Sequence, residues 1–267
     1  DLEAYRIDLE DTLRLKPHIL PKEMEKLLAD ASEICNNPDQ TYSIFSNADL
    51  KFPEVEDENG EMVQITHGRF IMLEESSDRR VRKETFEKLY GVYAQYSRTL
   101  ASVYSGQVKQ LIFQARARHY DTTLEAAVNA VNVSPQVYRN LVETVNKNLD
   151  KMHRYVRLRK RLLGVDELHM YDIYTPIIAG VSKNIPFEEA RETVLKALAP
   201  LGEDYLKVVR EGFENRWIDV YENEGKRSGA YSTGSYDSYP YILLNYTGNM
   251  DNLFTLIHEM GHSMHTW

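Results

Sequence analysis

The sequence predicts a mostly α-helical protein with a small β element, and three observations indicate this fold class. First, apolar residues recur three and four positions apart along most of the 267 residues, a spacing that gathers them on one face of a helix. Second, the longest such segment, from Asp78 to about His119, contains no proline. Third, the periodicity is lost in residues 51–75 and 225–248, where turn-forming and strand-forming residues gather instead.

The first fifty residues are expected to form helices that prolines separate. Residues 2–15 and 21–35 both carry helix-like apolar spacing, and Pro17 and Pro21 mark the break between them. A further short helical stretch is expected between Pro38 and Asn47.

Residues 51–75 change in character and predict a small β-hairpin. A first strand is expected after Phe52-Pro53, a turn over residues 57–60, and a second strand over residues 62–66. Several acidic residues surround the turn, and we expect them to form a solvated loop, with a metal-binding role as the less favoured alternative.

Residues 78–164 are expected to contain two long helices. Asp78 is the expected N-cap of the first helix. A basic run follows it, and we expect this run to pair with nearby acids, namely Glu74, Glu75 and Glu84. The second helix is expected to begin at Ser134-Pro135, where a capping residue precedes a proline, and to end at Gly164.

Residues 225–248 are rich in glycine, serine and tyrosine, and they follow two expected helices at 187–199 and 202–213. They lead into a strand-like run at residues 241–246. An extended segment of small residues can pair with an extended peptide, and tyrosine hydroxyls can donate to a developing oxyanion. An equally supported alternative is a loop and strand that pack under the following helix.

The last ten residues contain the pattern H-E-x-x-H, formed by His258, Glu259 and His262. Because a helical turn takes about 3.6 residues, the two histidines lie on one face, where their ring nitrogens can bind one Zn²⁺. Glu259 is offset around the helix, so that it can accept a proton from a water on the metal as this water attacks a carbonyl. The pattern is typical of a zinc metallopeptidase, and the alternative is a surface helix with two ordinary histidines.

The residues around this pattern favour a helix with one buried face. Apolar residues precede it at helical spacing, and Asn249 and Asp251 are candidate N-caps. Gly261 stands between the two histidines, where it costs about 1 kcal/mol of helix propensity relative to alanine. We therefore expect another group to pack close to the backbone at Gly261.

The sequence identifies two zinc ligands, whereas a catalytic zinc site usually has three protein ligands and a water. His265 lies on roughly the same face as His262 and is either a third ligand or a residue that packs against the ligands. The remaining histidines have no ligand spacing and are expected to be structural: His18, His67, His119, His153 and His169.

Composition limits the kinds of partner. The formal net charge of −9 argues against nucleic acid as the main partner and weakly against an anionic membrane surface. No apolar run approaches the ~20 residues of a membrane span. Because Cys35 is the single cysteine, no intrachain disulfide can form, and we expect a reducing, cytoplasmic setting.

Both ends of the chain look interrupted. Asp1 opens directly into a helical pattern, and only Thr266 and Trp267 follow His265, without a glycine or asparagine cap. We therefore expect a missing segment or a second chain to complete the zinc site.

Taken together, these motifs resemble the oligoendopeptidase F group of the thimet-oligopeptidase-like zinc metallopeptidases. The resemblance covers essentially the whole chain. The segments that carry it are 216–223, 226–231, 234–236, 240–245 and 258–265, together with 47–53, 67–69 and 168–172.

The resemblance implies a helical, two-lobed peptidase whose narrow channel admits short unstructured peptides and excludes folded proteins. It implies that His258 and His262 bind zinc, with a glutamate on a following helix as third ligand, and that Glu259 is the general base. The family's strand before the zinc helix lines the substrate cleft. From this region we take three candidate substrate contacts, namely Gly234, Ser235 and Tyr236.

The resemblance also implies a domain organisation. Residues 1–50 would form a helical part of the N-terminal lobe, residues 51–75 the hairpin and its loop, and residues 76–267 a catalytic domain that stops at the zinc helix. The family's third ligand and its transition-state-stabilising tyrosine and histidine lie beyond this helix, so the chain is expected to be a central fragment. We expect a zinc endopeptidase; the alternatives are a non-catalytic helical module and a zinc exopeptidase.

Overall fold

The computed structural model describes residues 2–178 and 183–267 and confirms a mostly helical fold with two small sheets. The chain divides into two compact units, each made of two separate segments. Unit 1 comprises Asp1–Ser46 and Gln95–Gly164, and unit 2 comprises Asn47–Ala94 and Val165–Trp267. This division differs from the expected ranges 1–50, 51–75 and 76–267, because the helices of 95–164 pack with the N-terminal segment.

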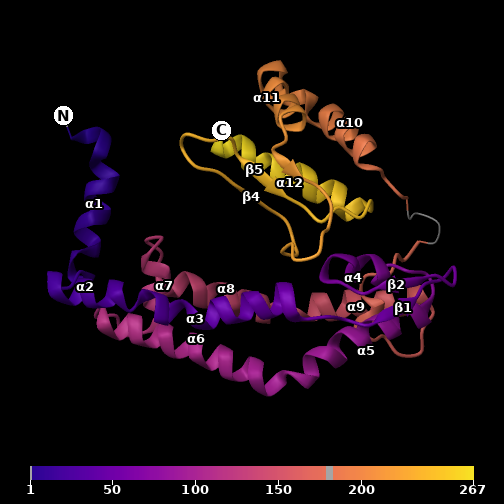
Figure 1. Cartoon of the computed structure of the whole chain (residues 1–267), viewed down its shortest axis with the longest axis horizontal. Coiled ribbons are helices and arrows are strands. Elements are labelled where there is room, and N and C mark those ends of the chain that lie inside the picture. Colours follow the sequence, from indigo (N-terminus) through magenta and orange to yellow (C-terminus); the bar gives the residue numbers. More distant parts are fainter. Residues whose placement is uncertain (1, 179–182) are drawn as a thin grey trace. The chain divides into compact units, whose positions relative to one another are not determined.

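Unit 1 is built from helices, and short turns join those that follow one another within each of its two segments (Figure 1). Its helices are α1 (Arg6–Leu15), α2 (Lys22–Asp30), α3 (Ser32–Ile44), α6 (Ser97–Ala117), α7 (Thr123–Asn129), α8 (Pro135–Lys147) and α9 (Leu149–Leu163). Helix α3 packs along α6, and a Cβ added at Gly106 of α6 would lie 3.2 Å from the Pro38 ring. The Arg118 guanidinium forms hydrogen bonds of 2.9 Å with both carboxylate oxygens of Glu25, which joins the end of α6 to α2.

Three helix boundaries in this part of the chain differ from the sequence prediction. Pro38 lies inside α3 instead of beginning a helix, and packing against α6 at Gly106 accommodates its ring. The expected helix from Asp78 is divided at Tyr96, close to the boundary between the units at Ala94 and Gln95. The expected helix from Pro135 is divided at Asn148, whose side-chain amide donates to the Thr144 carbonyl and so competes with the helical hydrogen bonds.

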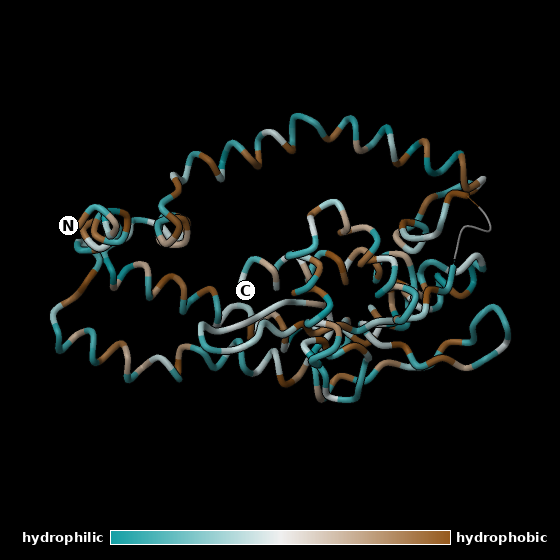
Figure 2. Tube along the Cα trace, turned by 90° about the horizontal axis from the view of Figure 1, so that it is seen from above, coloured by the Kyte–Doolittle hydropathy of each residue, from teal (hydrophilic) through white to brown (hydrophobic). Residues whose placement is uncertain are grey.

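Other helix signals are confirmed. Ser134 caps α8 by accepting from the Gln136 N–H, and Gly164 ends α9 in the left-handed conformation with φ 65°. Figure 2 shows polar and apolar residues alternating along the helices, as the sequence periodicity predicted. In the part of the chain that the structure describes, we find no helix long and apolar enough to cross a membrane.

The first segment of unit 2 contains the predicted hairpin and two helices. Strand β1 (Glu54–Glu56) pairs antiparallel with β2 (Met62–Gln64), and most of the acidic residues around its turn are exposed, as expected for a solvated loop. Helix α4 (His67–Glu74) is capped by the Thr66 side chain, and α5 (Arg79–Gln95) by Asp78, which accepts from the Arg80 N–H.

The basic run at the start of α5 pairs chiefly with a distant acid. Arg79 and Arg82 both contact Asp172, at 2.9 Å and 3.0 Å, and among the described residues of this run only Arg80 contacts one of the expected acids, Glu84. Burial opposes the ionisation of Asp172, but the hydrogen bonds from Arg79, from the His169 backbone and from Arg82 lower its pKa to about 2. The network joins α5 to the loop that contains Asp172.

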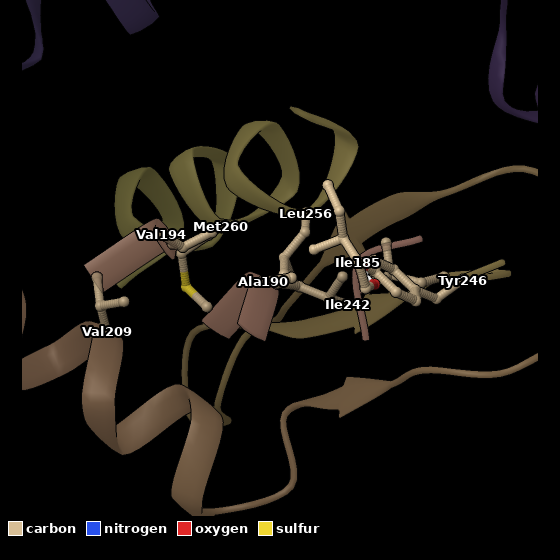
Figure 3. Packing of buried hydrophobic residues seen from close by; sticks show 9 residues of the cluster. Ile185, Ala190, Val194, Val209, Ile242, Tyr246, Leu256 and Met260 are labelled. Carbon is tan, nitrogen blue, oxygen red and sulfur yellow. Dashed lines mark hydrogen bonds between the residues drawn. The ribbon is translucent and has the colours of Figure 1, made fainter. Parts of the chain in front are cut away.

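In the described part of its second segment, unit 2 has a three-stranded sheet and three α-helices, α10 (Phe187–Leu198), α11 (Glu203–Glu214) and α12 (Met250–Thr266). In the sheet, β5 (Tyr241–Leu243) lies between β3 (Ile218–Asp219), to which it is parallel, and β4 (Tyr231–Thr233), to which it is antiparallel. Figure 3 shows the core between these elements, in which Leu256 and Met260 of α12 meet Ile242 of β5 and Ala190 of α10.

Candidate metal and peptide site

Helix α12 carries the H-E-x-x-H pattern, and its position is fixed at its start and along its buried face. Asn249 is the N-cap and accepts a 2.8 Å hydrogen bond from the Asn252 N–H, as the sequence predicted. Leu256 and Met260, one helical turn apart, are both fully buried in the core. The opposite face of α12 is therefore turned away from the core.

His258 and His262 lie on this outer face and their rings approach one another. Both are exposed, and their Nε2 atoms are 3.1 Å apart, with the ring planes at 86°. Two nitrogens on a tetrahedral Zn²⁺, each about 2.0–2.1 Å from the metal, would be about 3.3 Å apart. The spacing of these two ring nitrogens therefore fits two adjacent ligands of one zinc ion.

Glu259 lies between this outer face and the sheet. Successive helical residues differ by about 100°, which places Glu259 between His262 and Ser263 around the axis. Its exposed fraction is 8%, and Ser263, one turn further, is fully buried. Among the described residues no hydrogen-bond partner is found for the Glu259 carboxylate. Glu259 is thus a mostly buried residue next to the histidine pair, and its carboxylate is free to accept a proton.

Strand β4 lies against this side of α12. The hydroxyls of Ser232 and Ser263 are 2.8 Å apart, so that one donates to the other across the contact between strand and helix. The backbone N–H groups of Ile242 and Leu244 donate hydrogen bonds toward β3. Because backbone groups alternate in direction along a strand, those of Tyr241 and Leu243 face β4. The same alternation leaves the backbone groups of Ser232 on the free edge of the sheet.

The three candidate substrate contacts follow β4 and lie in a turn. A Cβ added at Gly234 would be 2.9 Å from Thr266 of α12, so glycine is needed there for close packing. Ser235 and Ser238 form hydrogen bonds with one another across the turn, and Tyr236 is fully exposed. Of the three, Gly234 therefore has a packing role in the structure, and the strand edge itself lies at Ser232.

The structure does not bring a third ligand to the histidine pair. Within residues 2–178 and 183–267, no three His, Cys, Asp or Glu side chains converge on one metal position, and His265 is not an exception. The close packing expected at Gly261 is also not found, since no described atom lies within 4 Å of a Cβ added there. Gly261 lies on the exposed side of α12, beside the histidines, which explains the empty space around it.

Sequence reasoning missed Ser232 and Ser263, although one signal for Ser263 was available. Ser263 follows Glu259 by four residues, and a small polar residue at this spacing would lie beside Glu259 on the helix. The partner Ser232 could not be found in this way, because 31 residues separate the two serines.

Comparisons with known proteins agree with this architecture. A model of peptidase family M3 matches residues 72–267, and a model described as oligopeptidase F matches residues 1–52. The chain is 48% identical to oligopeptidase PepF of Bacillus subtilis, over 100% of this chain and 40% of that protein. It is 45% identical to group B oligopeptidase PepB of Streptococcus agalactiae, over 100% of this chain and 44% of that one.

Solved structures give the same result. The crystal structure of oligoendopeptidase-F from Enterococcus faecium superposes with a TM-score of 0.68 at 39% identity, over 99% of this chain and 42% of that chain. A putative peptidase from Chlamydophila abortus gives a TM-score of 0.71 at 35% identity, over 99% of this chain and 44% of that chain. The chain thus spans less than half the length of these relatives. Because the M3 model matches most of its residues, the chain belongs to peptidase family M3.

Proposed function

We propose that this chain is the part of a zinc metallopeptidase that binds the metal through two histidines and supplies the general base. The proposed activity is hydrolysis of internal bonds in short peptides. The observation that carries the proposal is the arrangement on α12, where two histidine nitrogens lie 3.1 Å apart beside the sheltered carboxylate of Glu259.

His258 and His262 would hold the metal through their Nε2 atoms. Zinc, when bound, supplies a Lewis acid that polarises a carbonyl and lowers the pKa of water to about 7. A third protein ligand is expected from outside the described residues, because none of them converges with the pair. The binding site would thus be completed by another segment of a longer protein or by a second chain.

Glu259 would move the proton of the reaction. Its carboxylate is adjacent to the histidine pair and has no competing partner among the described residues, so an oxygen atom is free to accept a proton from the attacking water. The same oxygen can then return this proton to the amine nitrogen that leaves when the peptide bond breaks.

The free edge of β4 would align the peptide. The backbone N–H and C=O of Ser232 face this edge, and an extended peptide can pair with them as an added strand. The hydroxyl contact between Ser232 and Ser263 keeps this edge beside Glu259. Main-chain pairing requires an extended substrate, which favours short unstructured peptides over folded proteins.

The test is to replace Glu259 by glutamine in the full-length zinc-loaded protein. We expect Glu259→Gln to keep stoichiometric zinc and to abolish hydrolysis of a quenched fluorescent peptide, because the residue handles a proton and is not a ligand. Glu192→Gln, at an exposed position of α10, is the matched control and should keep both properties.

Other results would contradict parts of the proposal. Loss of zinc together with activity would make Glu259 a ligand. Full activity in Glu259→Gln would exclude it as the base and favour a non-catalytic role for this helix. Stepwise release of single terminal residues, seen by mass spectrometry of the products, would favour an exopeptidase.

A further inference from the structure

A cavity of about 180 Å³ lies beside the first two turns of α12. Its walls come from α4, from the residues before β4, from the chain that follows β5, and from α12. On α12 the lining residues include Asp251 and Thr255, and on α4 they include His67 and Gly68. All of these residues belong to unit 2.

The cavity and the histidine pair share one stripe of α12. Counting about 100° per residue, Asp251, Thr255, His258 and His262 all fall within about 60° around the helix axis. Asp251 precedes His258 by seven residues, a rise of about 10.5 Å along the axis. An extended peptide covers this distance with about three residues.

The cavity has a negative electrostatic character. Asp251 is the only lining side chain with a formal charge at neutral pH, it is exposed, and within the described residues it forms no ion pair. Behind the wall, Glu75 accepts a hydrogen bond from Asn249, and burial together with the nearby Asp251 raises the pKa of Glu75.

Two other titratable groups beside the cavity have partners of their own among the described residues. Glu222 lies against Gly68 and is 3.3 Å from the Arg69 guanidinium. On the α4 side, the Nε2 atom of His67 is 2.5 Å from the Tyr93 hydroxyl. Asp251, which lines the cavity and has no ion-pair partner among the described residues, is therefore a carboxylate that a cation entering the cavity can contact.

The direction of β4 indicates which part of a peptide would reach the cavity. Gly229 and Ala230, just before β4, line the cavity, whereas Gly234, just after it, packs against Thr266 at the far end of α12. The strand therefore runs in the same direction as α12. A peptide that pairs antiparallel, the more stable arrangement, would carry its C-terminal side toward the cavity.

We propose that this cavity is a specificity pocket that accepts the cationic side chain of a lysine or arginine within three residues on the C-terminal side of the cleaved bond. This inference rests on the proposed peptidase function and on peptide pairing at β4. Asp251 is the residue that contacts the cation. It thereby determines specificity and takes no part in bond cleavage.

The test uses the full-length zinc-loaded protein and quenched fluorescent peptides of one length. The peptides carry lysine, alanine or glutamate at each of the first three positions after the cleaved bond, and mass spectrometry confirms that bond. We expect kcat/KM to favour lysine over alanine by about tenfold at one position. In Asp251→Asn this ratio should fall toward one, in Asp251→Lys glutamate should be preferred, and Asp251→Glu should retain the preference.

Asp204→Asn is the matched control, because Asp204 also stands exposed in the first turn of a helix, α11. It should leave the ratio of kcat/KM for the lysine and alanine peptides unchanged. This result would show that the effect depends on the charge at the cavity and not on the loss of any acidic residue at the start of a helix. Equal kcat/KM for all peptides, a lysine preference that survives Asp251→Asn, or a preference on the N-terminal side would overturn the inference while the peptidase function stands. Failure to cleave any of the peptides would instead refute the proposed function.

Discussion

Glu74 is a buried carboxyl group, and replacing it by glutamine should stabilise unit 2 at alkaline pH. The Glu74 side chain is fully buried at the end of α4, and neither carboxylate oxygen has a hydrogen-bond partner among the described residues. Burial raises the pKa of Glu74 to about 8, although Arg82 attracts the charged form. At neutral pH the folded protein therefore holds this group in its neutral form.

The size of the effect follows from the difference between folded and unfolded pKa values. Between the unfolded value of 4.5 and the folded value of about 8, the folded state binds one more proton at Glu74 than the unfolded state. The contribution of Glu74 to the free energy of unfolding is thus fully present below pH 4.5. It decreases by about 1.4 kcal/mol per pH unit as pH rises toward 8. From pH 5.5 to 7.5 this amounts to about 3 kcal/mol in the free energy of unfolding.

The assay is urea unfolding of the full-length protein, followed by circular dichroism at pH 5.5, 6.5, 7.5 and 8.5. The wild type should lose stability across this range, and Glu74→Gln should lose most of this dependence and be the more stable protein at pH 8.5. Glu87→Gln, at an exposed position of α5, should follow the wild type. A Glu74→Gln protein with the same slope as the wild type, or one less stable at pH 8.5, would refute the argument.

Three further predictions concern α12 and its metal. Leu256→Ala removes a fully buried side chain from the core and should lower the free energy of unfolding by about 3–5 kcal/mol, measured by urea denaturation, whereas a loss below about 1 kcal/mol would show that α12 is not anchored there. Ser263→Ala should remove the contact with Ser232 and raise KM for peptides several-fold while zinc content stays stoichiometric. An unchanged KM would show that this contact does not contribute to aligning the substrate. The 267-residue chain expressed alone should bind zinc weakly and be inactive, as tested by elemental analysis and a peptide assay, and tight zinc with robust turnover would mean that it contains its own third ligand.

Features that depend on local residue patterns were predicted well from the sequence. Helix α12 follows from its Asn249 cap and the apolar spacing before the histidines, and the histidine pair follows from a separation of four residues. The hairpin β1–β2 and the start of α8 at Pro135 likewise depend on signals within a few residues.

Features that depend on distant contacts were not predicted. Pro38 remains inside α3 because of a glycine on α6, and Arg82 pairs with an acid 90 residues away instead of the nearby glutamates. The Ser232–Ser263 contact also joins separate elements. Sequence periodicity carries no information about such partners, because it describes one element at a time.

A crystal structure of the zinc-loaded full-length protein would show whether His258 and His262 bind one zinc ion beside Glu259. Anomalous scattering at the zinc absorption edge locates the metal independently of the protein coordinates. We expect one zinc ion within about 2.0–2.1 Å of the Nε2 atoms of both His258 and His262, with the Glu259 carboxylate close to the metal but not bound to it. A zinc ion bound to only one of these histidines, bound directly by Glu259, or located away from α12 would refute the proposed roles of these three residues.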